Sequence, residues 1–275
     1  MNSRALLLLT AFALPSAAQQ LELPRPSLGA KVSQTVGLTD VSVDYSSPAA
    51  RGRVIFGGVV PFGQVWRAGA NAATRIVFSK DVQIGGKTVA AGAYALFAIP
   101  AKDRWTFIVN KDAGQFGAFQ YRQAEDVVRV EVKPEAAPFR ERMSFIFSET
   151  TDEGTRLDLE WERTRASLPL RVGTAEQAAA SIAGLTRNGW RPWNAAASYM
   201  LARKDYDSGL RLVDASLRLR EDWQNTWTKA QLLAGQGKIR EARAMAERAQ
   251  ELGSKDPANF AAADEVKKAL AEWKP

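Results

Sequence analysis

The sequence predicts two domains, an antiparallel β-sandwich followed by an all-α domain of helical hairpins. Between residues 31 and 162, short segments alternate apolar and polar residues, which is typical of strands with one buried and one solvated face. From Thr174 onward Ala, Leu, Arg and Glu dominate, and the two-residue period does not return. We therefore expect a β domain at residues 19–168 and a helical domain at residues 169–275, preceded by a signal peptide at residues 1–18.

The N-terminal segment has the three parts of an export signal. Arg4 supplies a positive charge, and the apolar segment 5–14 is too short to span a bilayer. Ser16 and Ala18 stand at the −3 and −1 positions of a cleavage site, so that the mature chain would begin at Gln19. No later segment approaches the roughly 18 apolar residues of a membrane span. We expect a periplasmic or secreted protein without an integral membrane segment; an ordinary N-terminal helix is the alternative.

The composition restricts the chemistry that is open to this protein. The 275 residues include no His and no Cys, which excludes disulfides, His- or Cys-based zinc and copper sites, and nucleophiles activated by histidine. Carboxylates, Lys, Tyr, Ser, Thr and Arg remain, and an all-oxygen metal site is still open. We expect no cofactor. The net charge of +7 is not gathered into a Lys/Arg run, so we also expect no nucleic-acid partner.

Several short segments of the β domain have the pattern of strands. The expected strands are 41–45, 73–79, 105–110, 128–133, 143–148 and 157–162. In the segment 73–79, Ile76 and Phe78 lie on one face. Gly85 and Gly86 stand between two strand-like segments, where a two-residue hairpin turn requires positive φ. Many short strands without intervening helices predict a β-sandwich, with an open barrel as the alternative.

The helical segment repeats itself with an offset of 33 residues over about 193–254. Gly209 aligns with Ala242, and Ser216 aligns with Ala249. Small residues at these positions let paired helices approach closely. The segment resembles the tetratricopeptide repeat, whose period is about 34 residues. This resemblance implies a surface that binds a protein or peptide, whereas a plain helical bundle with a structural role is the alternative.

Other residues indicate where the helices begin and end. Thr174, followed three residues later by Gln, resembles a capping box. Pro192 suits a first helical turn, and Gly237 and Gly253 suit helix ends. Because about three repeats are needed to bury a solenoid core, flanking helices are expected to cap the two repeats. These helices are expected near 174–187 and 257–273.

The segment PFGQVWRAGAN, residues 61–71, is the strongest candidate for a ligand-binding site. Trp66 would offer a ring for stacking, Arg67 a forked donor for carboxylate, phosphate or sugar hydroxyls, and Asn71 an orienting amide. In the structural alternative, Trp66 covers one end of the core, Arg67 lies along the sheet surface and Asn71 caps a turn.

Arg51 and Arg53, in AARGRVIFGG, would join this site if the two loops meet. No catalytic constellation is recognisable, so the sequence favours a non-enzymatic protein whose β domain is a scaffold or weak ligand binder. One alternative is an enzyme that acts on envelope glycans through carboxylates and arginine. Another is a non-catalytic carbohydrate-binding module, with a glycan partner stacked on Trp66 or Trp105.

The runs RGRVIFG, VPFGQVWRAGAN and WTFIVNKDAGQFGAFQY are long and specific. Over about residues 25–165 the chain resembles the exported bacterial family known as domain of unknown function 2911. The resemblance implies an extracytoplasmic β domain that is often followed by tetratricopeptide-like helices, and it implies no reaction, ligand or catalytic residue. Phe56 and Phe116 stand where members often have Trp, and the loop 111–116 lacks the His that many members carry.

Overall fold

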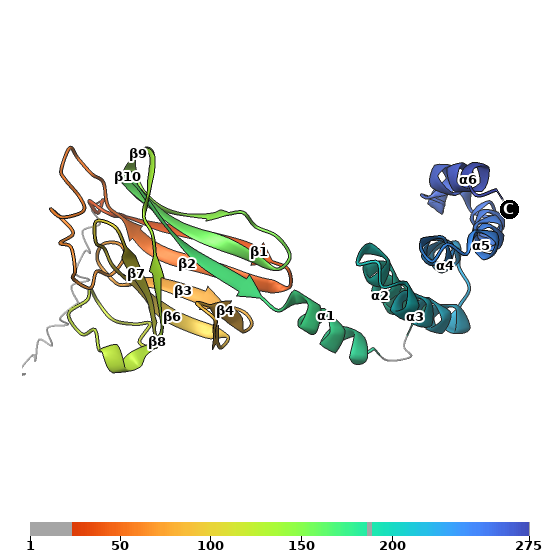
Figure 1. Cartoon of the computed structure of the whole chain (residues 1–275), viewed down its shortest axis with the longest axis horizontal. Coiled ribbons are helices and arrows are strands. Elements are labelled where there is room, and N and C mark those ends of the chain that lie inside the picture. Colours follow the sequence, from red (N-terminus) through yellow and green to blue (C-terminus); the bar gives the residue numbers. More distant parts are fainter. Residues whose placement is uncertain (1–23, 186–188, 275) are drawn as a thin grey trace, which may run out of the picture. The chain divides into compact units, whose positions relative to one another are not determined.

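The computed structural model describes residues 24–185 and 189–274. The chain divides after Val172 into two compact units. The first is a β unit, and the second, beginning at Gly173, is a helical unit (Figure 1). No helix among the described residues is long and apolar enough to cross a bilayer.

The β unit consists of two antiparallel sheets (Figure 1). The larger sheet has the strand order β1-β2-β3-β6-β7-β8, and the smaller has the order β5-β4-β10-β9. The strands of the larger sheet are β1 (Leu28–Val36), β2 (Thr39–Ser47), β3 (Thr74–Phe78), β6 (Gly92–Ile99), β7 (Trp105–Asn110) and β8 (Asp126–Val132). Those of the smaller sheet are β4 (Val82–Ile84), β5 (Lys87–Val89), β9 (Glu135–Ser148) and β10 (Gly154–Val172). A short 3-10 helix, η1 (Gln123–Glu125), precedes β8.

The core of the β unit lies between the inner faces of the two sheets. Val41 on β2, and Ile76 and Phe78 on β3, point inward from the larger sheet. Leu157 and Leu159 on β10 meet them from the smaller sheet, and all five side chains belong to one buried cluster. The alternation of apolar and polar residues therefore predicts the buried faces correctly, and the predicted β-sandwich is confirmed.

The hairpin between β4 and β5 has the turn that its sequence requires. Gly85 and Gly86 have φ values of 57° and 77°, which is the left-handed conformation of both central residues of a type I′ turn. Strand β10, in contrast, is longer than the sequence pattern indicates. It continues past residue 168 to Val172 because its last residues pair with β4.

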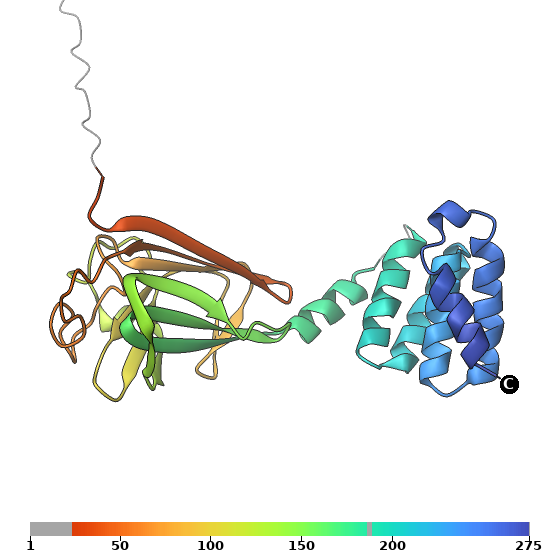
Figure 2. The same cartoon turned by 90° about the horizontal axis from the view of Figure 1, so that it is seen from above.

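Six α-helices follow in the described part of the chain. They are α1 (Thr174–Ala183), α2 (Trp190–Ala202), α3 (Tyr206–Leu219), α4 (Trp223–Gly235), α5 (Ile239–Gly253) and α6 (Ala263–Glu272), with a 3-10 helix η2 (Pro257–Asn259) between the last two. From α2 to α6 each helix packs against the next one in the chain. Figure 2 shows helices α2 to α5 running alongside one another.

The helix ends agree in part with the sequence signals. Pro192 lies in the first turn of α2, and Gly237, with φ of 76°, follows α4. The capping box expected with Thr174 as N-cap is wrong. Thr174 is the first residue of α1 and Gly173 is the N-cap, because β10 extends to Val172 and leaves only that glycine as a connection.

Close packing between helices explains why Gly209 stands where the second repeat has Ala242. A Cβ on Gly209 of α3 would overlap Cδ2 of Leu232 on α4, so the leucine can pack here only because Gly209 has no side chain. At the end of α5, a Cβ on Gly253 would overlap the ring of Phe260. Both glycines let neighbouring elements approach more closely than alanine would allow.

Candidate functional site

Trp66 lies in the core of the β unit. Its side chain is 8% exposed, and its indole stacks on that of Trp161 with ring centroids 6.1 Å apart. The rings of Phe56 and Trp105 meet it edge-on, and its Nε1 donates a hydrogen bond to the carbonyl oxygen of Gly69 at 3.0 Å. The ring has no face left for a sugar, and Trp105, at 1% exposure, has none either.

Two of the other predicted residues, Arg53 and Asn71, bond within the protein. The guanidinium of Arg53 donates to the carbonyl oxygens of Ala50 at 3.0 Å and Ala49 at 2.8 Å. Asn71 has φ of 59°, a conformation that Asn tolerates better than most residues, and its Nδ2 donates to Ser46 Oγ at 3.1 Å. Both side chains therefore fasten the long loop that connects β2 to β3.

Arg51 and Arg67 keep more of their bonding capacity. Arg51 is exposed, and its backbone N–H donates to Glu141 Oε1 at 2.9 Å. Nε of Arg67 is buried without a hydrogen-bond partner among the described residues, and burial lowers the pKa of this guanidinium. Arg51 and Arg67 both lie in the connection between β2 and β3 and share no hydrogen-bond partner among the described residues.

The loop that carries Asn71 meets a different loop, at residues 111–122. Gly117 N–H donates to the Asn71 carbonyl oxygen, and Ala73 N–H donates to that of Gln115, both at 3.1 Å. Sequence reasoning missed this contact, because nothing in either segment specifies which distant backbone it will pair with. The contact holds the outward-facing ring of Phe116 at the molecular surface.

A polar network holds the base of the same loop. The hydroxyl of Tyr121 donates to Asp126 Oδ2 at 2.6 Å, and Arg129 donates to that oxygen at 3.0 Å. Asn110 Nδ2 donates to the other carboxylate oxygen of Asp126 at 2.8 Å. Burial and the neighbouring carboxylate raise the pKa of Tyr121 to about 12, so this tyrosine stays protonated and acts as a hydrogen-bond donor.

The most deeply buried carboxylates of the β unit lie on β10, away from the predicted loop. Glu160 accepts hydrogen bonds from Arg140 and Arg165, and Asp158 Oδ2 accepts one from Ser148 Oγ at 2.7 Å. Within the described ranges, no group of three or more acidic side chains is placed to hold a metal ion. A carboxylate that is clamped by two guanidinium groups is held as an anion, which suits an ion pair better than proton transfer.

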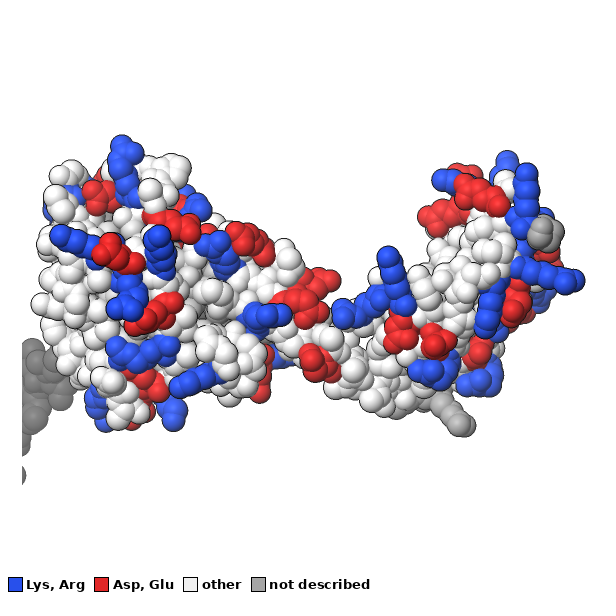
Figure 3. All heavy atoms as spheres, viewed as in Figure 1, with Lys and Arg blue, Asp and Glu red and all other residues white. Residues whose placement is uncertain are grey.

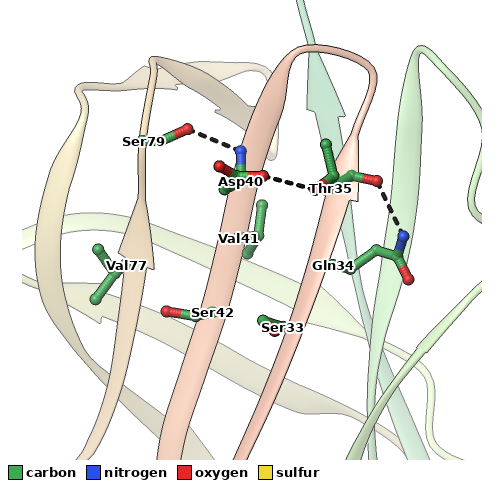
Figure 4. Close-up of a pocket in the computed structure, with 8 residues that line it drawn as sticks. All are labelled: Ser33, Gln34, Thr35, Asp40, Val41, Ser42, Val77 and Ser79. Carbon is green, nitrogen blue, oxygen red and sulfur yellow. Dashed lines mark hydrogen bonds between the residues drawn. The ribbon is translucent and has the colours of Figure 1, made fainter.

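A shallow polar groove crosses β1, β2 and β3 on the outer face of the larger sheet (Figure 4). Its volume is about 340 Å³, and Ser33, Ser42 and Val77 are among the residues that line it. At one end, Thr35 Oγ1 donates to Asp40 Oδ1 at 2.6 Å. Asp40 is the one carboxylate that lines the groove, so the groove does not hold the acid pair that a glycosidase requires.

In the helical unit, α2 and α4 pack against each other. The hydroxyl oxygens of Ser198 on α2 and Thr228 on α4 are 3.5 Å apart, which places these two faces side by side. Asn194 Oδ1 is buried and accepts no hydrogen bond from the described residues. On the molecular face drawn in Figure 3, basic and acidic side chains are interspersed over both units, without a patch of one sign.

The comparison with known families agrees with the limits of the β unit. The family described as protein of unknown function (DUF2911) matches residues 27–170, which reach from β1 almost to the end of β10. No curated protein and no solved structure matches the chain. Because the family match covers more than half of the 275 residues, the chain belongs to the DUF2911 family of proteins of unknown function, and its β unit is the part that defines this membership.

Proposed function

We propose that this protein is an exported, non-catalytic binding protein whose helical unit docks a protein or peptide. The observation that carries this proposal is the succession of helical hairpins, α2 with α3 and α4 with α5, in which each helix packs on the next (Figure 2). Stacked hairpins of this kind form extended surfaces that are used for binding. The export signal that the sequence predicts at residues 1–18, outside the described residues, supports a periplasmic or secreted location.

Equivalent small residues support the interpretation of the hairpins as tetratricopeptide-like repeats. Gly209 and Ser216 of α3 are buried, as are their counterparts Ala242 and Ala249 of α5. In α3, Gly209 lies against Leu232 of α4, and Ser216 Oγ donates to the Trp190 carbonyl oxygen of α2 at 2.9 Å. Because the same spacing recurs 33 residues later, the two hairpins use the same packing rule.

The shared face of α2 and α4 has the chemistry that a peptide requires. Gln224 and Gln231 lie on one side of α4 by their helical spacing, with the buried Thr228 between them, and Asn194 and Ser198 are four residues apart on α2. The contact between Ser198 and Thr228 joins these two rows. Neutral amides and hydroxyls can bond to peptide backbone groups without the cost of burying a charge.

Site-specific photo-crosslinking of the full chain tests this proposal. A photoreactive amino acid replaces Gln231 on the docking face or, as the control, the exposed Arg240 on α5. We expect a protein adduct in the bacterial envelope from position 231 and none from position 240. Ser198→Trp should abolish the adduct by filling the face. Equal adducts at both positions, or no adduct at either, would show that the helical unit has a structural role only.

A further inference from the structure

A second concave site lies at one end of the β unit, where loops of the larger sheet meet the smaller sheet. Its volume is about 290 Å³. The loop between β2 and β3, the loop between β6 and β7, and strands β7, β9 and β10 all contribute to its wall. The residues that line it include Phe56, Phe62, Lys102, Trp105, Glu135 and Arg163.

Aromatic rings form the apolar part of this cavity. Phe56 and Trp105 meet edge-to-face with ring centroids 4.7 Å apart, and both contact the buried tryptophan cluster of the core. Phe62 lies against Gly57, whose φ is 87°; a Cβ there would come within 2.6 Å of the phenyl ring. The rings are therefore held in place by the core and by the glycine turn before any ligand binds.

Two cationic side chains stand at the rim without a partner of opposite charge. Lys102 is exposed and takes part in no ion pair or hydrogen bond among the described residues. Arg163 is also free of ion pairs in the described chain, and its guanidinium carbon lies 5.8 Å from the ring centroid of Phe139. Glu135 is the one acidic residue in the lining, so the rim has a net positive charge.

We propose that this cavity binds a small amphipathic carboxylate. The apolar body of the ligand contacts Phe56 and Phe62, which the buried Trp105 supports from the core side, and its carboxylate pairs with Lys102 and Arg163. Apolar walls with a few placed polar groups are the usual composition of small-molecule sites. The volume of about 290 Å³ is just below the range of about 300–1,000 Å³ that sites for drug-sized ligands span, which favours a ligand smaller than a typical drug.

Phenylacetate is the probe for this proposal, and its neutral isostere phenylacetamide is the chemical control. Binding to the full chain is measured by isothermal titration calorimetry. We expect saturable binding of phenylacetate and about tenfold weaker binding of the amide, since two solvent-exposed ion pairs together contribute roughly this factor. Absence of saturable binding of phenylacetate, or equal affinity for both compounds, would overturn the proposal.

Variants locate the binding at the cavity. Lys102→Gln combined with Arg163→Gln should weaken phenylacetate binding about tenfold and leave the amide unaffected. The control double variant, Arg75→Gln with Lys87→Gln, removes two exposed cations that do not line the cavity and should bind like the wild type. Ala136→Trp fills the cavity from its lining and should abolish binding of both compounds. An equal loss in the control, or full binding by Ala136→Trp, would place the ligand elsewhere.

Discussion

Substitution of Glu160 by Gln tests whether paired arginines hold the long hairpin of β9 and β10 together. The Glu160 side chain is 5% exposed, and its two carboxylate oxygens bond separately to Arg140 at 2.8 Å and to Arg165 at 2.7 Å. Burial alone would raise the pKa of Glu160, but the hydrogen bonds from Arg165 and Arg140 outweigh it and lower the pKa below its usual range. Gln keeps the shape of the side chain and removes the charge.

The expected cost follows from the burial of the three groups. Removing one partner from a fully buried ion pair costs about 3–5 kcal/mol, because the other charge is left without compensation. Here the side chains of Arg140 and Arg165 are 40% and 38% exposed, so water can solvate them again once the carboxylate is gone. We therefore expect Glu160→Gln to lower the free energy of unfolding of the β unit by about 2 kcal/mol.

Amide hydrogen exchange of β10 measures this loss in the full chain and separates the β unit from the helical unit. The pH dependence provides a second measurement. A carboxyl with a lowered pKa in the folded state stabilises fully above its ordinary pKa of about 4.3, and this contribution is lost as the pH falls through the folded-state pKa. The gap between wild type and Glu160→Gln should be constant from about pH 7 to pH 5 and should close in more acidic solution.

The exposed pair of Glu149 and Arg156, 2.9 Å apart, provides the matched control. Glu149→Gln should change the stability by less than about 0.5 kcal/mol, because an exposed ion pair is well screened by water. If Glu160→Gln were as mild as Glu149→Gln, or if its effect did not change with acidification, the clamp would not stabilise the hairpin and this reasoning would be refuted.

Three other predictions test the packing. Gly85→Ala should cost more stability than Gly86→Ala in urea unfolding. Both glycines have positive φ, but a Cβ at position 85 would lie 2.7 Å from a valine of β8, whereas a Cβ at position 86 would contact no atom within 4 Å. Equal losses of stability would contradict this prediction. Gly209→Ala should destabilise the helical unit by about 1–2 kcal/mol in thermal melting, although Ala has the higher helix propensity, because its Cβ would overlap Leu232. Adding Leu232→Ala to the same chain should relieve this overlap. Trp66→Phe should lower the stability of the β unit by about 2–3 kcal/mol in the same hydrogen-exchange measurement, because it leaves the buried carbonyl oxygen of Gly69 without its hydrogen bond. A loss below about 0.5 kcal/mol would argue that Trp66 is not a core residue.

The strands could be predicted because their information is local. In Thr39–Ser47 and Thr74–Phe78, the alternation of apolar and polar residues predicts which face of the strand is buried. Gly85 and Gly86 are equally informative, since few other residues adopt the backbone of that turn. These features require no knowledge of distant parts of the chain.

The role of Trp66 depends on partners that local pattern cannot supply. Its backbone N–H and carbonyl both bond to Ala98 at 2.8 Å, and this bridge turns the indole toward Trp161 in the other sheet. From the sequence, Trp66 could be a ligand platform or a core residue, and the core residue is the favoured interpretation. The start of α4 is also hard to predict from the sequence. Its capping box uses Asp222 and Asn225, whereas the familiar pattern has Ser or Thr with Glu three residues later.

The loop between β2 and β3 shows why a highly specific run of residues need not be a ligand site. Ala68 and Asn71 have positive φ, and the Ala68 carbonyl oxygen accepts a hydrogen bond from Thr74 Oγ1 at 2.8 Å. A long loop without regular secondary structure must satisfy its backbone groups through particular side chains, and these demands alone make its sequence specific. The same loop places Phe56 and Phe62 on the wall of the end cavity. Its binding role is therefore better tested by filling that cavity than by mutating Trp66, because a substitution at Trp66 removes part of the core and would impair binding whether or not a ligand ever touches the ring.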